Sequence, residues 1–327
     1  MTTVVWIDTS YNRRRRRRVL GKLTPVEFDV TYAAADQARS PRTPDRQPEW
    51  GQSRCTLRRV SLPVPHPDAR AVVTGASHGI GEALASELAA RGHNLIITSR
   101  REELLNDLAG RLTDRHNVTV EVRPADLADA TQRAELRDEL ATRNISVLCA
   151  NAGAATIGPV AQLDAAGERA LVQLNAAGVH DLVLAVLPGM LERRSGGILM
   201  SGSTAGNAPI PNNATYAATK AFINSFSESL HHEVRGSGVH VTLLAPGPVR
   251  TFTVESVDEA TSSRLVPDYL WVSGEHAAKA ALDGLARNKT RVVPGGPAKI
   301  MSLTNQYAPR RISVPIIGRV YGQLAGQ

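Results

Sequence analysis

Cysteine is scarce in this sequence of 327 residues: there are only two, Cys55 and Cys149. Because small secreted proteins rely on several disulfides, two widely separated cysteines exclude a disulfide framework and fit a reducing compartment. We therefore predict a cytoplasmic location. The sequence also lacks an apolar run of the roughly 20 residues that a membrane-spanning helix needs. Its apolar residues, 42% of the chain, still suffice for a hydrophobic core.

Most of the chain carries nearly equal numbers of positive and negative side chains. Residues 69–327 carry 25 Lys and Arg against 24 Asp and Glu, whereas residues 1–68 carry 13 against 7. The net charge of +7 therefore belongs largely to the N-terminal segment. A near-neutral body gives no reason to expect a nucleic-acid ligand, so we predict no functional nucleic-acid binding. We predict no metal site either.

The N-terminal segment, residues 1–68, is expected to be an appendage to the body of the protein. Residues 1–36, with the six arginines Arg13–Arg18, resemble the C-terminal tail of integrase-core transposases from insertion sequences. The acidic metal ligands of those enzymes would precede this tail, so we do not expect transposition. We favour a gene-fusion remnant or a misplaced start, with a basic disordered arm as the alternative. Residues 37–68, rich in Pro, Arg, Ser and Gln, predict a flexible linker.

A tyrosine and a lysine four residues apart form the most informative pattern. In Tyr216-Ala-Ala-Thr-Lys220 the two side chains share one face of a predicted helix, and Ser203 precedes the tyrosine by thirteen residues. The ammonium favours an ionised phenol, so we expect it to lower the pKa of Tyr216. This arrangement predicts a proton donor for carbonyl chemistry. The alternative is a packed tyrosine ring beside a solvated lysine.

A glycine-rich turn lies near the start of the body. Residues 70–74 predict a strand, Gly75, Gly79 and Gly81 mark the turn, and residues 82–91 predict a helix. A strand, a glycine turn and a helix in this order bind a pyrophosphate, because glycine permits close backbone approach and the helix N-terminus offers unpaired N–H groups. The spacing departs from the general Gly-x-Gly-x-x-Gly pattern.

Six elements together resemble the classical type of the short-chain dehydrogenase/reductase family, over residues 69–295. These elements are Thr74-Gly75-x-x-x-Gly79-Ile80-Gly81, Asn151-Ala152-Gly153, Asn175, Ser203, Tyr216-x-x-x-Lys220 and Pro246-Gly247. The resemblance implies an NAD(P)-dependent oxidoreductase that interconverts a carbonyl and a secondary alcohol.

The resemblance also implies a role for each of four catalytic residues. Tyr216 would transfer the proton, and Ser203 would hydrogen-bond the substrate oxygen. Lys220 would lower the phenol pKa and hold the nicotinamide ribose. Asn175 would hold a water that links the lysine to solvent, and a merely packed helix residue is its alternative.

The alternation of strands and helices predicts an α/β fold in residues 69–297, a single Rossmann-type, doubly wound parallel sheet flanked by helices. The family resemblance implies the strand order 3-2-1-4-5-6-7, with the cofactor at the C-terminal strand ends. The expected strands are 70–74, 94–99, 118–123, 146–150, 197–202, 239–245 and 290–293.

Cofactor choice is predicted from the end of the second strand. Residues 96–101 read Ile-Ile-Thr-Ser-Arg-Arg, without the carboxylate that accepts hydrogen bonds from the ribose of NAD. Arg100 suits a 2′-phosphate, because a guanidinium stays charged and offers several donors. We therefore predict NADP(H). His78 would assist unless it only faces solvent, and Arg101 could simply begin a solvated helix face.

The remaining cofactor contacts come from the resemblance. Asp126 matches an adenine-contacting residue, with an N-cap of the next helix as its rival interpretation. Thr251 matches the partner of the carboxamide, unless its segment serves only as a proline-shaped loop. The full expected set is Gly75, Ser77, His78, Gly79, Ile80, Gly81, Arg100, Asp126, Leu127, Asn151, Ala152, Gly153, Tyr216, Lys220, Pro246, Gly247, Val249 and Thr251.

The sequence does not name the substrate. Residues 252–273 are expected to cover the pocket, and their apolar side chains favour an apolar or lipid-like carbonyl. Those side chains are Phe252, Val254, Leu265, Val266, Tyr269, Leu270 and Trp271.

Residues 298–327 form a predicted C-terminal amphipathic extension. Packing against the body or a partner subunit is favoured over weak membrane contact, because Pro309 and Pro315 would interrupt a long helix. Homo-oligomer formation stays open. Two other classes of function also stay open: a catalytically idle NADP(H)-binding protein, and a DNA-interacting protein that uses Arg13–Arg18.

Overall fold

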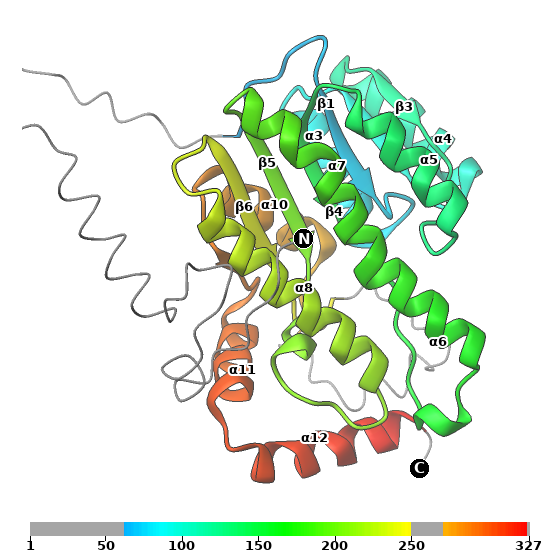
Figure 1. Ribbon diagram of the computed structural model, residues 1–327, viewed down its shortest axis with the longest axis vertical. Coiled ribbons are helices and arrows are strands. Elements are labelled where there is room, and N and C mark those ends of the chain that lie inside the picture. Colours follow the sequence, from blue (N-terminus) through cyan, green and yellow to red (C-terminus); the bar gives the residue numbers. More distant parts are fainter. Residues whose placement is uncertain (1–61, 250–270, 326–327) are drawn as a thin grey trace, which may run out of the picture. The chain divides into compact units, whose positions relative to one another are not determined.

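The computed structural model describes residues 62–249 and 271–325 (Figure 1). These residues all belong to one compact unit, Arg58–Gln327. The transposase-like residues 1–36 and nearly all of the linker 37–68 lie outside the described residues. The domain boundaries drawn from the sequence therefore stay predictions.

Seven parallel strands form one sheet in the predicted order 3-2-1-4-5-6-7, which confirms the fold class. Helices on both faces bury the central strands, and this burial is why their sequences are continuous apolar runs. The strands are β1 (Arg70–Thr74), β2 (Leu95–Thr98), β3 (Val120–Val122), β4 (Ile145–Ala150), β5 (Gly196–Ser201), β6 (Val239–Leu244) and β7 (Arg291–Val292).

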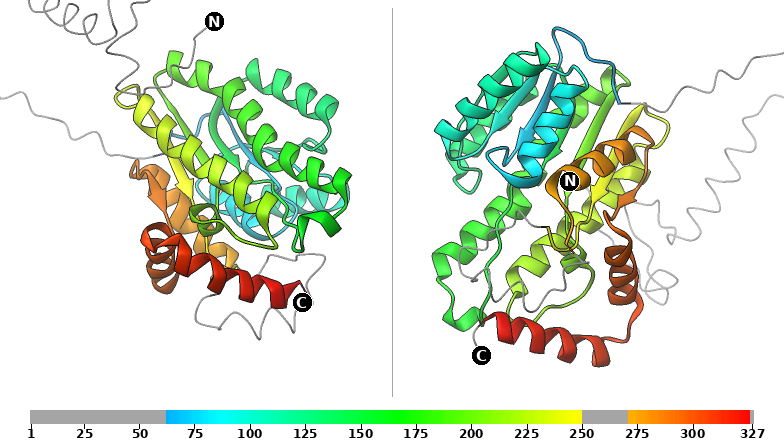
Figure 2. Two further views of the ribbon diagram at one scale, coloured as in Figure 1. Left: turned by 60° about the horizontal axis from the view of Figure 1, so that its bottom comes forward. Right: turned by 180° about the vertical axis from the view of Figure 1, so that it is seen from behind.

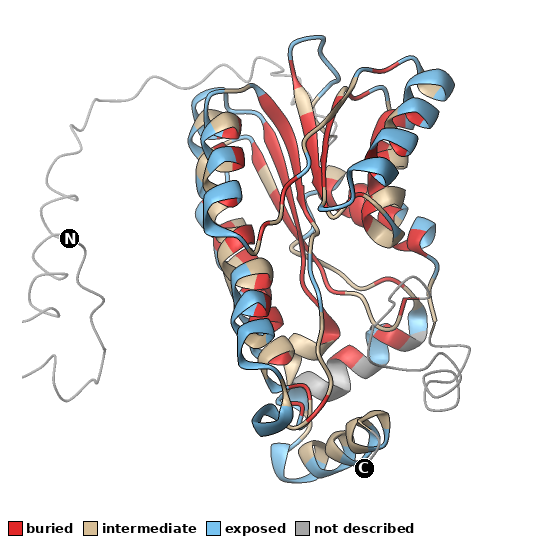
Figure 3. Cartoon of the chain, turned by 90° about the vertical axis from the view of Figure 1, so that its right-hand side faces the viewer, coloured by how far each residue is buried: buried red, intermediate tan, exposed pale blue. Residues whose placement is uncertain are grey.

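The sheet separates two hydrophobic cores, one between each of its faces and the helices that cover that face. One core packs β1 and β2 against Leu84, Leu108 and Leu282, and the other packs β4 and β6 against Leu182 and Ile223. Figure 3 shows both cores as buried strands and inward helix faces. The helices are α3 (Gly79–Ala90), α4 (Glu102–His116), α5 (Ala130–Ala141), α6 (Ala165–Val172), α7 (Val179–Glu192), α8 (Ala214–Glu233) and α10 (Gly274–Ala286).

Residues 165–192 form one continuous helical segment made of α6, a π-helix (η3, Gln173–Gly178) and α7. This segment is long and apolar enough to cross a membrane by length and composition, contrary to the sequence-based expectation; an 18-residue window in it has a mean hydropathy of 1.6 and is 39% buried. Its buried residues, among them Leu182, Val183 and Met190, pack in the core beside the sheet. The segment therefore has the packing of a core helix.

Two helices follow the sheet, α11 (Gly296–Tyr307) and α12 (Arg310–Leu324). Pro309 is the N-cap of α12, whereas Pro315 lies inside the helix. The expectation that Pro315 interrupts a helix here is wrong. Pro315 is exposed, so water can solvate the backbone carbonyl that it leaves without a partner. Figures 1 and 2 show α12 near the start of α8.

Candidate active site

The carboxyl ends of β1, β4 and β5 are tied together by side-chain hydrogen bonds. The Thr74 hydroxyl accepts from the backbone N–H groups of Asn151 (2.9 Å) and Ala152 (2.8 Å). The Asn151 amide donates to the Thr74 carbonyl (3.2 Å) and accepts from the Ser201 hydroxyl (2.9 Å). Sequence reasoning gave Thr74 and Ser201 no role of their own. A hydroxyl at the last residue of a buried strand was the available signal.

The glycine turn has the conformation that phosphate binding needs. Gly75 and Gly79 have φ values of 67° and 65°, a region that side chains disfavour. A Cβ on Gly81 would overlap the Gly75 carbonyl and lie 2.8 Å from the Asn151 amide nitrogen. His78 is the N-cap of α3 and makes no side-chain capping bond. The first N–H groups of α3 are thus left for an anionic ligand.

We predict that Gly81→Ala abolishes measurable cofactor binding, because the added methyl group cannot fit without displacing the backbone of the turn. The measurement is a fluorescence titration with NADPH. Gly110→Ala on the exposed surface of α4 is the matched control, since a Cβ there meets nothing within 4 Å. The control should bind NADPH normally and gain up to about 1 kcal/mol of stability. Equal NADPH binding by both variants would contradict the assigned turn.

A cationic cluster faces this turn from the end of β2. The Arg101 guanidinium lies 2.6 Å from His78 Nδ1 and 3.3 Å from the Ser77 hydroxyl. Burial lowers the pKa of His78, and the neighbouring Arg101 lowers it further, against a smaller opposite effect of Glu82. Arg100 is exposed and makes no ion pair among the described residues. The structure therefore brings Arg101, rather than Arg100, to the turn.

Asp126 and Leu127 follow β3, where the sequence analysis expected adenine contacts. The Asp126 carboxylate accepts from the N–H of Ala128 (2.9 Å). The rival interpretation of Asp126 as an N-cap is wrong, because Asp129 caps α5 by accepting from two backbone N–H groups. Leu127 is buried, and its carbonyl accepts from Arg133 (2.9 Å).

The predicted proton donor lies on α8 with its partners. Tyr216 and Lys220 share one face of this helix, with Lys220 Nζ 5.7 Å from the centroid of the Tyr216 ring. Lys220 is buried and donates to the Ser201 carbonyl (2.8 Å). Ser203, just after β5, is hydrogen-bonded to the Tyr216 phenol. Three residues of the predicted site are thus brought together.

The electrostatics of this group differ from the sequence-based expectation. Burial raises the pKa of Tyr216 to about 12, the bond to Ser203 lowers it, and the nearby Tyr321 raises it. Burial lowers the pKa of Lys220 to about 8. The expected net lowering of the Tyr216 pKa is not found here, because desolvation of the phenol is the dominant contribution. Tyr216 is therefore a neutral phenol at physiological pH and can donate a proton.

Asn175 lies in the π-helical segment η3, and it is completely buried. Its amide oxygen accepts from the N–H of Ala154 (3.0 Å), and its amide nitrogen donates to the Ala154 carbonyl (2.9 Å) and to the Thr219 hydroxyl (3.1 Å). Thr219 in turn donates to the carbonyl of Tyr216 (2.8 Å). This chain links the π-helix to the catalytic face of α8. A π-helical turn is itself typical of functional sites.

Asn151, Ala152 and Gly153 pass close to the same group. A Cβ added to Gly153 would lie 3.2 Å from the Asn175 amide oxygen and 3.3 Å from Lys220 Nζ. The backbone at Gly153 therefore runs beside both polar groups, and contact of this segment with the cofactor stays a prediction.

Asn224 is a buried residue that the sequence analysis missed. Its amide donates to the Ser203 carbonyl (2.9 Å) and accepts from the Ser203 N–H (3.3 Å), which fixes the backbone of that serine. Asn224 follows Lys220 by four residues on α8, as Lys220 follows Tyr216. That repeated helical spacing was the signal that could have found it.

The segment after β6 lies partly outside the described residues. The Pro246 carbonyl accepts from Thr204 N–H (3.0 Å), and Val249 pairs with Val272 in a parallel bridge. Gly247 lies between them. Thr251 and the predicted pocket cover from Phe252 to Leu270 lie outside the described residues, so their roles stay predictions.

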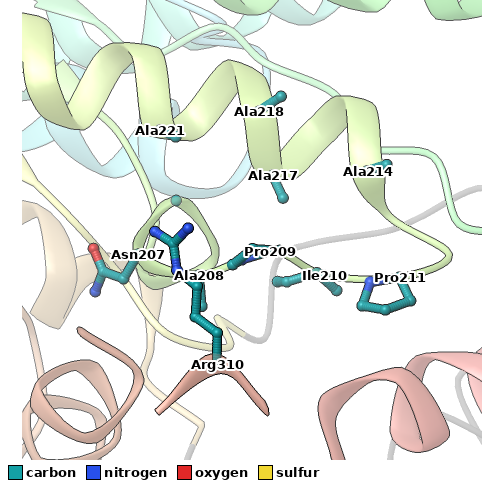
Figure 4. A pocket seen from close by; sticks show the side chains of 11 residues that line it. Asn207, Ala208, Pro209, Ile210, Pro211, Ala214, Ala217, Ala218, Ala221 and Arg310 are labelled. Carbon is teal, nitrogen blue, oxygen red and sulfur yellow. The ribbon is translucent and has the colours of Figure 1, made fainter. Parts of the chain in front are cut away.

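An apolar cavity of about 490 Å³ lies between α8 and the start of α12 (Figure 4). The alanines Ala214, Ala217, Ala218 and Ala221 form its α8 wall, and residues 206–211 form another wall. Arg310 projects into it from the start of α12. Ala217 and Ala221 directly follow Tyr216 and Lys220 in sequence but lie on another face of α8, and none of the predicted catalytic residues lines this cavity.

Comparison with known proteins identifies the family. Residues 69–262 match the short chain dehydrogenase family. Sulfoacetaldehyde reductase 2 of Chromohalobacter salexigens is 36% identical over 215 residues, which cover 64% of this chain and 84% of that protein. The very-long-chain 3-oxoacyl-CoA reductase of Bos taurus is 35% identical over 185 residues, 55% of this chain but 59% of that protein.

A solved structure agrees with these sequence matches. A short-chain dehydrogenase from Sphingobium yanoikuyae in complex with NADPH is 31% identical, with a TM-score of 0.63, over 72% of this chain and 92% of that one. The chain belongs to the short-chain dehydrogenase family. It is a nicotinamide-dependent oxidoreductase of carbonyls and alcohols. The likeness of residues 1–36 to a transposase tail gains no support from these matches and stays a prediction.

Proposed function

We propose that the protein reduces a carbonyl on an apolar small molecule with NADPH, and that Tyr216 donates the proton. The observation that carries this proposal is the group formed by Ser203, Tyr216 and Lys220 at the carboxyl ends of the strands. When bound, the cofactor supplies the hydride. The neutral phenol of Tyr216 gives its proton to the developing alkoxide, and the hydroxyl of Ser203 stabilises the same oxygen.

Lys220 and Asn175 act around the proton donor. The buried ammonium lies close enough to the Tyr216 ring to stabilise the phenolate that remains after proton transfer. Its place beside Gly153 also suits a contact with the cofactor ribose. Asn175 donates to the Thr219 hydroxyl, which donates to the Tyr216 carbonyl, and in this way positions the backbone of the proton donor. A water held by Asn175, which would return the proton from solvent, is part of the same proposal.

The cluster around the Arg101 guanidinium supports a preference for NADPH. Arg101, His78 and Ser77 converge at the turn next to the end of β2, where a 2′-phosphate would lie. The relative solved with NADPH is consistent with this choice. Arg100 remains a second phosphate ligand in this proposal.

We predict that Arg101→Ala lowers kcat/KM for NADPH about 10- to 100-fold, because a charge-assisted bond of roughly 1.5–3 kcal/mol is lost. The value for NADH should change little, since NADH carries no 2′-phosphate. Arg100→Ala is the matched control and should have the smaller effect, because Arg100 does not contact the turn. Steady-state kinetics with both cofactors provide the measurement. An equal loss for NADPH and NADH in Arg101→Ala would refute the assignment.

The reaction itself is tested by a screen of ketones, aldehydes and secondary alcohols with both cofactors on the full chain. The apolar side chains expected to cover the pocket favour hydrophobic ketones among these substrates. Carbonyl-dependent oxidation of NADPH would support the proposal. NADPH binding without turnover on any member of the panel would favour the catalytically idle alternative. Cytoplasmic location and homo-oligomer formation stay predictions.

A further inference from the structure

The C-terminal helix α12 has two unlike faces. Its inner face approaches the segment that leads to Tyr216: a Cβ on Gly318 would lie 3.1 Å from the Pro211 ring, and one on Gly322 would lie 3.6 Å from the Asn212 amide nitrogen. Glycines at both positions let the helix pack closely. The face that points away from the body is therefore fixed by this packing.

The outer face of α12 is apolar and exposed. Ile312, Ile316 and Val320 are 62%, 56% and 37% exposed, and their spacing of four residues places them in one stripe. Large aliphatic side chains that form a continuous exposed stripe are characteristic of a surface that binds a partner or a membrane. Among the described residues, nothing covers this stripe.

The charge around this stripe has one sign. From residue 284 to the end, the sequence contains seven Lys and Arg and no Asp or Glu. Two of these cations, Arg311 and Arg319, lie on α12, are exposed, and make no ion pair among the described residues, whereas Arg310 points into the cavity against α8. A basic helix with an exposed apolar stripe has the composition of an interfacial helix. Its charge is complementary to an anionic surface.

We propose that the outer face of α12 docks on an anionic lipid bilayer, with Ile312, Ile316 and Val320 among the headgroups and Arg311 and Arg319 beside anionic lipids. A second copy of this chain fits the face less well, because α12 against α12 would bring Arg311 and Arg319 of both copies together without a carboxylate in either helix. A spanning role does not fit, because 15 residues make a helix of about 22 Å, shorter than the hydrocarbon core.

Docking through α12 would hold the catalytic centre near the bilayer. The inner face of the same helix contacts Pro211 and Asn212, which precede Tyr216 by a few residues. An apolar carbonyl dissolved in the membrane would then reach the enzyme without crossing water. This consequence rests on the proposed function, whereas the docking surface itself does not.

The test is cosedimentation of the full chain with vesicles of phosphatidylcholine alone or with roughly 30% phosphatidylserine. Arg13–Arg18 are replaced by glutamine in every protein, so that the N-terminal arginines do not contribute. We expect binding to the mixed vesicles that weakens with added salt, and little binding to phosphatidylcholine alone. Equal binding to both kinds of vesicle, or to neither, would overturn the proposal.

Two substitutions on α12 and one control locate the surface. Ile316→Asp should weaken binding to the mixed vesicles at least tenfold, and Arg319→Gln should weaken it about fivefold. Leu104→Asp, at a 39% exposed leucine on α4, is the matched control and should bind as the parent does. Equal binding by Ile316→Asp and the control would overturn the proposal. Loss of self-association in Ile316→Asp, measured by sedimentation velocity, would instead identify a second copy as the occupant and overturn it equally.

The docking proposal and the proposed function can be refuted independently of each other. Ile316→Asp should oxidise NADPH with a water-soluble ketone at the parent's rate, because Ile316 lies on the outer face of α12 and is not one of the predicted reacting groups. Vesicle binding by a protein without carbonyl-dependent activity would refute the proposed function and leave the docking surface standing. Carbonyl-dependent activity without vesicle binding would refute the docking surface and leave the proposed function standing.

Discussion

Replacement of Tyr216 by phenylalanine is expected to lower kcat for carbonyl reduction about a thousandfold, which corresponds to roughly 4 kcal/mol of transition-state stabilisation. The variant keeps the ring that packs beside Lys220 but has no proton to donate. Its dissociation constant for NADPH should change less than about threefold, because the phosphate-binding turn is untouched. Steady-state kinetics and an NADPH titration measure the two quantities. A variant with near-normal kcat would remove Tyr216 from the mechanism.

Tyr307→Phe provides the matched control for this substitution. Tyr307 is 76% exposed at the end of α11, so loss of its hydroxyl removes no buried contact. We expect unchanged kcat and unchanged stability. An equal loss of activity in both tyrosine variants would point to a general defect and not to proton transfer.

Replacement of Lys220 by methionine is expected to lower activity and to raise stability. Lys220 is 5% exposed, and burial lowers its pKa from 10.5 to about 8. That shift corresponds to about 3 kcal/mol of destabilisation at neutral pH, because the folded protein holds a buried charge. The Ser201 carbonyl loses its donor in the variant, which costs about 1 kcal/mol. We therefore expect a net gain of roughly 2 kcal/mol at pH 7.

The expected gain in stability of the Lys220→Met variant depends on pH. Between pH 8 and pH 10.5 the unfolded chain binds a proton at Lys220 that the folded protein has released, so wild-type stability rises with pH in this window. Below pH 8 Lys220 is protonated in both the folded and the unfolded state, so the full destabilisation by the buried charge is present. The advantage of the methionine variant should hence be largest below pH 8 and shrink toward pH 10.5.

Urea unfolding of both proteins across this range provides the measurement, with Lys289→Met as a control at an exposed lysine. The control should show no pH-dependent gain. A Lys220→Met protein that is less stable than wild type at pH 7 would show that the ammonium is stabilised by interactions that outweigh its burial. Retained activity would separate Lys220 from the reaction.

Much of the fold was predictable because its signals are local. The apolar runs predicted where the strands lie, and the family resemblance implied their order; all strand bounds agree within two residues. Gly75, Gly79 and Gly81 have backbone conformations or close contacts that few other residues tolerate. Tyr216 and Lys220 were found because a spacing of four in a helix fixes a shared face.

The properties that were mispredicted depend on tertiary structure. The pKa of Tyr216 is set by desolvation, and the depth at which its phenol lies is not encoded in the spacing to Lys220. The direction of Arg101 toward His78 depends on how α4 starts against the turn. The tolerance of Pro315 within α12 depends on the solvent that surrounds it. Asn224 was missed because its contact with Ser203 joins two elements distant in sequence.

The most direct test of the central claim is a single-turnover experiment with NADPH already bound to the full chain. A ketone identified in the substrate screen is mixed with wild type and with Tyr216→Phe, and the loss of NADPH absorbance reports the chemical step alone. The account predicts a rate at least about a hundredfold lower in the variant at equal cofactor occupancy. Equal rates in the two proteins would contradict it.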